Sequence, residues 1–147
     1  MAGALPLMEA ATQGLILFAH GARDAAWAAP FDAIAALVRQ RQPAWQVRVA
    51  FLDLMRPTLG EAAAALAQGG CTRVMVRPMF LGTGGHLRRD LPPMLADLRR
   101  AHPGIAFELH EAIGEEAAVH AAMAEAIARA TSPQPAAESG SEREEPR

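Results

Sequence analysis

The chain alternates short apolar runs with stretches of helical periodicity, and this alternation limits its fold more than any other feature. In the helical stretches apolar residues recur three, four and seven positions apart, as at Leu91, Met94, Leu95 and Leu98. The four apolar runs have the length of strands, and they are residues 14–19, 46–52, 73–79 and 105–111. This order predicts the α/β class, with an open, mostly parallel four-stranded sheet and helices on both faces. We expect the flavodoxin-like strand order 2-1-3-4.

Local signals mark where the helices begin. Thr58 and Glu61 form a capping-box pattern at the start of the second helix. Asp90 is expected to cap the third helix, and the fourth helix is expected over about residues 115–130. The residues of the fourth helix expected to face inward are Val119, Met123 and Ile127.

The domain organisation follows from the extent of this pattern. Residues 14–131 are predicted to form a single domain, preceded by a flexible segment over residues 1–13. From residue 132 to residue 147 the chain loses all periodicity and is rich in charge, Pro, Ser and Gly. This composition predicts a disordered tail.

Composition excludes several functional classes. All 14 basic residues are Arg, so Schiff-base chemistry on Lys and the usual P-loop nucleotide site are both excluded. The only Ser residues lie in the predicted tail, which leaves a Ser-His-Asp hydrolase without a nucleophile in the domain. A net charge of -2 is too small to indicate binding to nucleic acid or to a membrane surface.

Cysteine usage and hydropathy predict the compartment. Cys71 is the only cysteine, so neither an internal disulfide nor a cysteine-based metal cluster can form within the chain. The apolar run at residues 14–19 is too short to span a membrane. We therefore expect a cytoplasmic protein with no membrane partner.

Two histidines follow strands that the predicted order places side by side. Ligands of an open α/β sheet bind beyond the carboxyl ends of the strands, where the strand order reverses. His20 comes directly after the first strand, and His86 lies in the Gly-rich loop after the third. Asp53 follows the second strand and His110 ends the fourth. The strand order therefore predicts that both loops open on one crevice, each bringing one His.

Imidazole binds divalent iron, cobalt, nickel and zinc, and it exchanges protons near neutral pH. Two His ligands and perhaps one carboxylate make an incomplete shell, which suits a protein that passes its metal on rather than a closed structural site. The plainer interpretation is that these histidines pack or shape turns and that the loop glycines serve only the turns. Asp53 would then be a turn or helix-approach residue, and Arg88 and Arg89 would be solvated surface charge.

The ordered set of motifs resembles the small sirohydrochlorin chelatases, the class II chelatases of the cobaltochelatase and ferrochelatase kind. The resemblance covers about residues 14–130. It rests on these segments in order: His20-Gly21-Ala22-Arg23-Asp24 with Pro30-Phe31, Phe51-Leu52-Asp53, Pro78-Met79-Phe80-Leu81, Gly85-His86 and Asp90-Leu91-Pro92.

The resemblance implies that His20 and His86 are the catalytic and metal-handling residues, with Asp53 as a further metal ligand. The family commonly has Ser after the His-Gly pair, so Ala22 removes a hydroxyl here. The carboxylates of the substrate need cationic partners, and we expect these to be Arg23, Arg88 and Arg89.

The activity implied is the insertion of a divalent metal, with Co²⁺ favoured and Fe²⁺ or Ni²⁺ as alternatives, into sirohydrochlorin for cobalamin or another tetrapyrrole. The metal is a substrate, and no permanently bound cofactor is expected. A homodimer is expected, because larger class II chelatases place two such lobes around the substrate. A ferrochelatase for siroheme and a metal carrier without insertion activity remain open. A phosphotransfer domain with His20 as nucleophile would lack the usual Arg-His-Gly signature, since Ala19 precedes His20.

Overall fold

The computed structural model describes residues 12–131, and within them four strands form one parallel sheet. Each strand pairs in parallel with its neighbours in the order β2-β1-β3-β4, which confirms the predicted α/β class and strand order. The strand ends differ from the predicted ones by two residues at most. The strands are β1 (Gln13–Ala19), β2 (Gln46–Phe51), β3 (Arg73–Pro78) and β4 (Ala106–Leu109).

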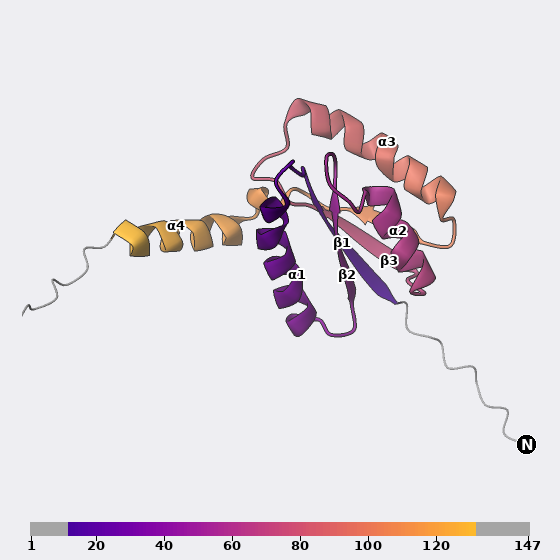
Figure 1. The fold of residues 1–147 in the computed structure, drawn as a ribbon, viewed down its shortest axis with the longest axis horizontal. Helices are drawn as coiled ribbons and strands as arrows, with labels where there is room; N and C mark the ends of the chain where they lie inside the picture. Colours follow the sequence, from indigo (N-terminus) through magenta and orange to yellow (C-terminus); the bar gives the residue numbers. More distant parts are fainter. Residues whose placement is uncertain (1–11, 132–147) are drawn as a thin grey trace, which may run out of the picture. The chain divides into compact units, whose positions relative to one another are not determined.

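Helices connect the strands and cover both faces of the sheet. They are α1 (Ala29–Arg41), α2 (Leu59–Gln68), α3 (Gly85–Ala101) and α4 (Ala117–Thr131), with the short 3-10 helices η1 (Ala25–Ala28) and η2 (Ile113–Glu115). Helices α2 and α3 lie on one side of the strands and α1 lies on the other (Figure 1). The chain divides into two compact units, Met1–Glu116 and Ala117–Arg147, so α4 is described by itself.

The core of the first unit is aliphatic and unequal on the two faces of the sheet. The larger cluster lies under α2 and α3 and includes the fully buried Ile16, Phe18 and Leu66. The smaller cluster lies under α1, and its buried members are Leu15, Leu17, Ala35 and Val47. Alternate residues of β1 therefore enter opposite clusters, as expected for a strand covered on both faces.

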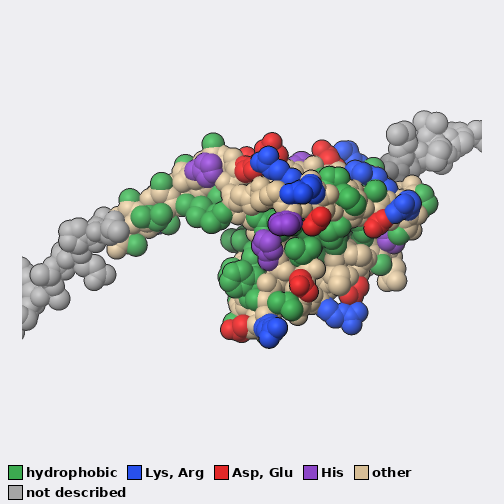
Figure 2. All heavy atoms as spheres, turned by 90° about the horizontal axis from the view of Figure 1, so that it is seen from above, with side chains coloured by type: hydrophobic (Ala, Val, Ile, Leu, Met, Phe, Trp, Pro, Cys, Tyr) green, Lys and Arg blue, Asp and Glu red, His purple; other side chains and the backbone are tan. Residues whose placement is uncertain are grey.

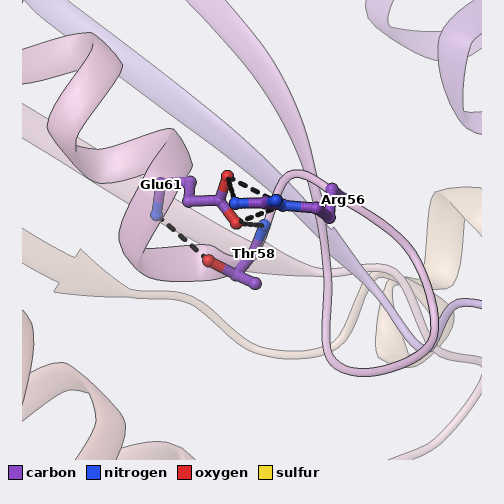
Figure 3. Close-up of polar contacts among 3 residues, drawn as sticks. All are labelled: Arg56, Thr58 and Glu61. Atoms are coloured by element: carbon purple, nitrogen blue, oxygen red, sulfur yellow. Dashed lines mark hydrogen bonds and ion pairs between the residues drawn. The ribbon is translucent and has the colours of Figure 1, made fainter.

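Helix α2 begins as predicted. The Thr58 side chain accepts a hydrogen bond from the Glu61 backbone N–H, and the Glu61 carboxylate accepts one from the Thr58 N–H, so the capping box is complete (Figure 3). The same carboxylate also binds the Arg56 guanidinium through two nitrogens, at 2.8 to 3.2 Å. The two capping-box bonds satisfy backbone N–H groups that have no partner within the first turn of the helix.

Helix α3 begins six residues earlier than predicted. Its N-cap is Gly84, so Asp90 lies inside the helix and does not cap it. The prediction was wrong because Asp90 precedes two prolines, a sequence typical of a helix start. Leu87 adds one buried residue on the N-terminal side of Leu91, and the helix begins early enough to include it. The buried residues of α3 are Leu87, Leu91, Leu95 and Leu98.

Helix α4 begins at Ala117, two residues after its predicted start. Met123 is 41% exposed and Ile127 is 63% exposed. The prediction that both face inward concerns the packing of α4 and stays a prediction. The single domain predicted over residues 14–131 stays a prediction. No helix among the described residues is long and apolar enough to cross a membrane.

The predicted terminal segments fall mostly outside the described residues. Gln13, which was predicted to belong to the N-terminal segment, is the first residue of β1. The predicted tail over residues 132–147 lies wholly outside the described part of the chain.

Candidate functional site

The loops after the strands are tied together beyond the carboxyl ends of the sheet. The Leu52 N–H donates to the Ala19 carbonyl at 2.8 Å, and the Asp53 N–H donates to the His20 carbonyl at 3.1 Å. On the other side of β1, the Met79 N–H donates to the Phe18 carbonyl at 2.7 Å. Parallel pairing thus continues past β1, β2 and β3, and it fixes the backbone on both sides of His20.

His20 is exposed and is held between two neighbouring loops. Its imidazole lies against the buried ring of Phe80, with the ring centroids 4.3 Å apart. On the other side, Gly21 has a φ of 87°, and a Cβ atom built there would lie 2.0 Å from the Asp53 carbonyl oxygen. Gly21 is therefore required both by its left-handed backbone and by this close approach. The imidazole is positioned by its surroundings while its surface stays open to solvent.

His86 lies in the first turn of α3 and is also exposed. Helix α3 follows β3, which pairs directly with β1, so both histidines belong to connections that follow neighbouring strands. His86 lies inside α3 and not, as had been predicted, in the preceding loop. The roles of both histidines stay predictions. Among residues 12–131, no three His, Cys, Asp or Glu side chains form a group that could hold a metal ion.

Asp53 uses part of its carboxylate to shape its own loop. One carboxylate oxygen, Oδ1, accepts a hydrogen bond from the Leu54 N–H at 2.8 Å. A carboxylate has further lone pairs, so this bond does not prevent ligation. The structure thus gives Asp53 a turn-forming role, and the predicted role as a metal ligand stays a prediction.

The predicted substrate-binding arginines differ in their contacts. Arg88 is 69% exposed and lies 3.8 Å from the Glu115 carboxylate, while Arg89 donates from Nε to the Gly85 carbonyl at 3.2 Å. Arg23 is exposed in the loop after β1. A surface ion pair of the Arg88 kind contributes little free energy, so its guanidinium can turn to another carboxylate at small cost.

Next to this edge lies a cavity of about 390 Å³, between the start of α3 and the end of β4. Its polar lining combines Thr83 and Arg88 with His110, Glu111 and Glu115. The His110 Nε2 atom lies 3.3 Å from the Glu108 carboxylate, but no aligned hydrogen bond reaches this buried nitrogen. Sequence analysis singled out His110 and Arg88. Thr83 and Glu115 were not predicted, because only the folded chain brings them to this cavity.

A set of exposed apolar side chains in the connections that follow the strands was not predicted either. Leu52 and Leu54 follow β2, Leu81 follows β3, and Trp27 lies in η1 after β1; all four are exposed. In Figure 2, hydrophobic and His side chains lie together on the surface of the first unit. No periodic pattern could have revealed these residues. Leu52 simply continues the apolar run of β2, and the signal of the others is only a large apolar residue within a loop.

The family model of CbiX matches residues 14–130, which is most of the chain. The chain belongs to the CbiX family. Among curated relatives of this family member, the sirohydrochlorin cobaltochelatase of Methanopyrus kandleri is 35% identical over 81 residues, which are 55% of this chain and 57% of that protein. The sirohydrochlorin ferrochelatase of Arabidopsis thaliana is 27% identical over 101 residues, which are 69% of this chain and 45% of that protein. The match thus spans about half the length of these relatives.

Solved structures support the family assignment through the fold. The crystal structure of a protein from Marinobacter aquaeolei VT8, described as CbiX of cobalamin (vitamin B12) biosynthesis, aligns with a TM-score of 0.71 and 29% identity. That alignment covers 80% of this CbiX-family chain and 96% of the other. The chelatase SirB of Bacillus subtilis subspecies spizizenii aligns with a TM-score of 0.70 at 24% identity, over 80% of this chain but only 50% of SirB. The second likeness shows a shared fold.

Proposed function

We propose that this chain inserts a divalent metal ion, with Co²⁺ as the favoured substrate, into sirohydrochlorin. The observation that carries the proposal is the match to the CbiX family over residues 14–130, combined with two exposed histidines, His20 directly after β1 and His86 in the first turn of the helix that follows β3. The name sirohydrochlorin cobaltochelatase, borne by relatives from Methanopyrus kandleri and Methanosarcina acetivorans, supports the tetrapyrrole and the metal.

The chemistry requires groups that accept protons and bind metal. A free tetrapyrrole has two inner N–H groups, and both protons must leave as a divalent metal forms bonds to the ring nitrogens. A neutral imidazole can take up a proton or donate a lone pair to the metal. In the proposed reaction His20 and His86 share these tasks, and no covalent bond forms between enzyme and substrate. Asp53 is the proposed additional ligand.

The arginines around the edge supply the complementary charge. Sirohydrochlorin carries carboxylates on the periphery of its ring, and guanidinium groups bind carboxylates through paired hydrogen bonds. Arg88, Arg89 and Arg23 are exposed around the two histidines. We assign to them the recognition of these carboxylates.

We also propose that the active form is a homodimer. One copy of this fold presents an open edge, and the fold alignment covers only half of the SirB chain. Two copies related by a two-fold axis would enclose a substrate from both sides.

A side-by-side assay with Co²⁺, Fe²⁺ and Ni²⁺ tests the proposal. Insertion changes the absorption spectrum of sirohydrochlorin, and the rate with protein is compared with the spontaneous rate for each metal. We expect the protein to accelerate the insertion of each metal that it accepts. The ratio of the rate with protein to the spontaneous rate should be largest with Co²⁺. A larger ratio with Fe²⁺ would favour the ferrochelatase activity after which the Arabidopsis relative is named. Metal binding without acceleration would make the protein a metal carrier.

A further inference from the structure

Leu54 has a backbone conformation that leucine rarely adopts. Its φ is 64°, and it is the only residue other than glycine with a positive φ among the described residues. The Met55 N–H donates to the Asp53 carbonyl at 2.8 Å, which closes a three-residue turn centred on Leu54. A γ-turn with positive φ at its centre is rare and strained, and a side chain with a Cβ atom adds to that strain.

The fold gains little from leucine at this position. The side chain is 59% exposed, and the turn is held by Asp53, whose carboxylate accepts the Leu54 N–H and whose carbonyl accepts the Met55 N–H. Gly or Asn would adopt this backbone with less strain. Strained residues whose side chains do not stabilise the fold are typical of functional sites.

The loop that carries Leu54 is anchored at both ends. At its start, Leu52 and Asp53 pair with the backbone of Ala19 and His20. At its end, the Phe51 N–H donates to the Pro57 carbonyl, and the Arg56–Glu61 ion pair joins the capping box of α2 (Figure 3). The leucine side chain is therefore presented on a fixed backbone.

The exposed leucines belong to the two loops that contact His20 and its neighbours. Leu52 and Leu54 belong to the loop whose Asp53 carbonyl faces Gly21, the residue after His20. In the other loop, Leu81 follows Phe80, which contacts the His20 ring, and Leu81 is 71% exposed. An exposed imidazole between two loops that each carry exposed leucines matches a flat ligand that has an apolar face and a polar centre, as a tetrapyrrole macrocycle has.

We propose that Leu54 is a substrate-binding residue that contacts the apolar face of the macrocycle and fixes it beside His20. This inference rests on the proposed chelatase function and adds a contact that determines how the substrate lies in the site. The contact buries apolar surface of both partners, so its loss weakens substrate binding while the imidazoles remain in place.

The test compares Leu54→Asn and Leu54→Gly with the wild type and with Leu37→Ala. Leu37 is an exposed leucine in α1, outside the candidate site, so its variant controls for the loss of surface apolar area. The melting temperature, the affinity for metal-free sirohydrochlorin, kcat, KM and the mass by light scattering are measured for each protein.

We expect Leu54→Asn to melt at or above the wild-type temperature, because strain is relieved, while KM for sirohydrochlorin rises about 10-fold. Leu54→Gly should show the same rise in KM, and Leu37→Ala should leave KM unchanged. An unchanged KM and affinity in both Leu54 variants would overturn the inference. It would also be overturned if KM rose only in step with dissociation of an oligomer, because Leu54 would then serve an interface. A wild type that neither binds sirohydrochlorin nor accelerates insertion would overturn the proposed function as well.

Discussion

The two ends of the parallel sheet use their loop residues for different purposes. At the amino ends, the Thr12 carbonyl accepts the Thr72 N–H at 3.0 Å, and the Gln46 side chain donates to the Gly69 carbonyl at 2.7 Å. Cys71 at this end is buried, and its burial raises the pKa of its thiol. Loop residues at this end join secondary-structure elements to one another, as expected of contacts that stabilise a fold.

At the carboxyl ends, side chains are exposed although backbone hydrogen bonds join the loops there as well. His20 and His86 are exposed, and so are Leu54 and Leu81, while the loops beneath them are joined by hydrogen bonds. Exposing large apolar side chains and straining Leu54 both oppose stability. This difference is expected if residues at this end contact a ligand, because open α/β sheets bind ligands beyond the carboxyl ends of their strands.

The largest effect is expected from the two histidines. His20→Ala and His86→Ala should each lower the catalysed insertion rate about 100-fold or more, the range for loss of a proton-transferring group. Because both residues are exposed, the melting temperature should change little. The double variant should be hardly slower than either single one if both act in one metal-transfer event.

His102→Ala is the matched control, since His102 precedes β4 at the opposite end of the sheet. Its insertion rate should equal that of the wild type. Folded His20 and His86 variants with wild-type rates would remove the functional difference between the two ends.

The sequence predicted the sheet well because burial imposes a clear pattern on it. Strands covered on both faces are continuous apolar runs, so their number and positions were visible. The start of α3 could not be predicted in this way, because Asp90 before two prolines is a stronger local signal of a helix start than Leu87 is. The sequence itself places His20 directly after β1, and the strand order places it next to the connection that follows β3.

The surroundings of His20 could not be predicted in the same way. The contact with Phe80, the turn at Leu54 and the cavity lined by Thr83 all depend on which loops meet in space. Sequence periodicity describes faces of helices and strands and carries no information on how loops approach one another. Leu54 in particular contradicts the local preference of its residue type.

Two glycines with positive φ sharpen the comparison between the ends. Gly21→Ala should destabilise the fold by about 3 kcal/mol, because it combines backbone strain with a clash 2.0 Å from the Asp53 carbonyl oxygen. Gly70 has a φ of 82° at the amino end, and a Cβ atom there would meet nothing within 4 Å. Gly70→Ala should therefore cost only about 1 kcal/mol. Urea unfolding of both variants measures the difference, and equal losses would show that the close approach at Gly21 relaxes freely.

The two ends of α3 offer a comparison within one helix. Arg88→Gln with Arg89→Gln should raise KM for sirohydrochlorin about 10-fold, the effect of losing roughly 1.4 kcal/mol of binding. The melting temperature should stay near that of the wild type, since the Arg88–Glu115 contact is long and exposed.

The control changes Arg99 and Arg100 in the last turn to Gln. Arg99 donates to the Phe107 carbonyl at 3.1 Å, and both charges favour the helix dipole at this end. This variant should melt at a lower temperature with an unchanged KM. If both pairs changed only stability, Arg88 and Arg89 would be ordinary surface charges.

The smallest effect is expected where the carboxyl-end loop joins α2, and it depends on pH. Hydrogen bonds from Arg56 lower the pKa of Glu61 below its ordinary value of 4.5. A carboxylate whose pKa is lowered by folding stabilises the protein above its ordinary pKa, and this contribution is lost as pH falls through the lowered value. Glu61→Gln should therefore flatten the decline of the melting temperature below pH 4.5, while it changes the value at pH 7 only slightly because both side chains are exposed.

Thr58→Ala removes the other half of the capping box and should cost about 1 kcal/mol at every pH. A Glu61→Gln variant with the full wild-type decline would show that the ion pair does not anchor the loop. A raised KM in the same variant, with stability preserved, would show instead that this anchor holds Leu54 in place for the substrate.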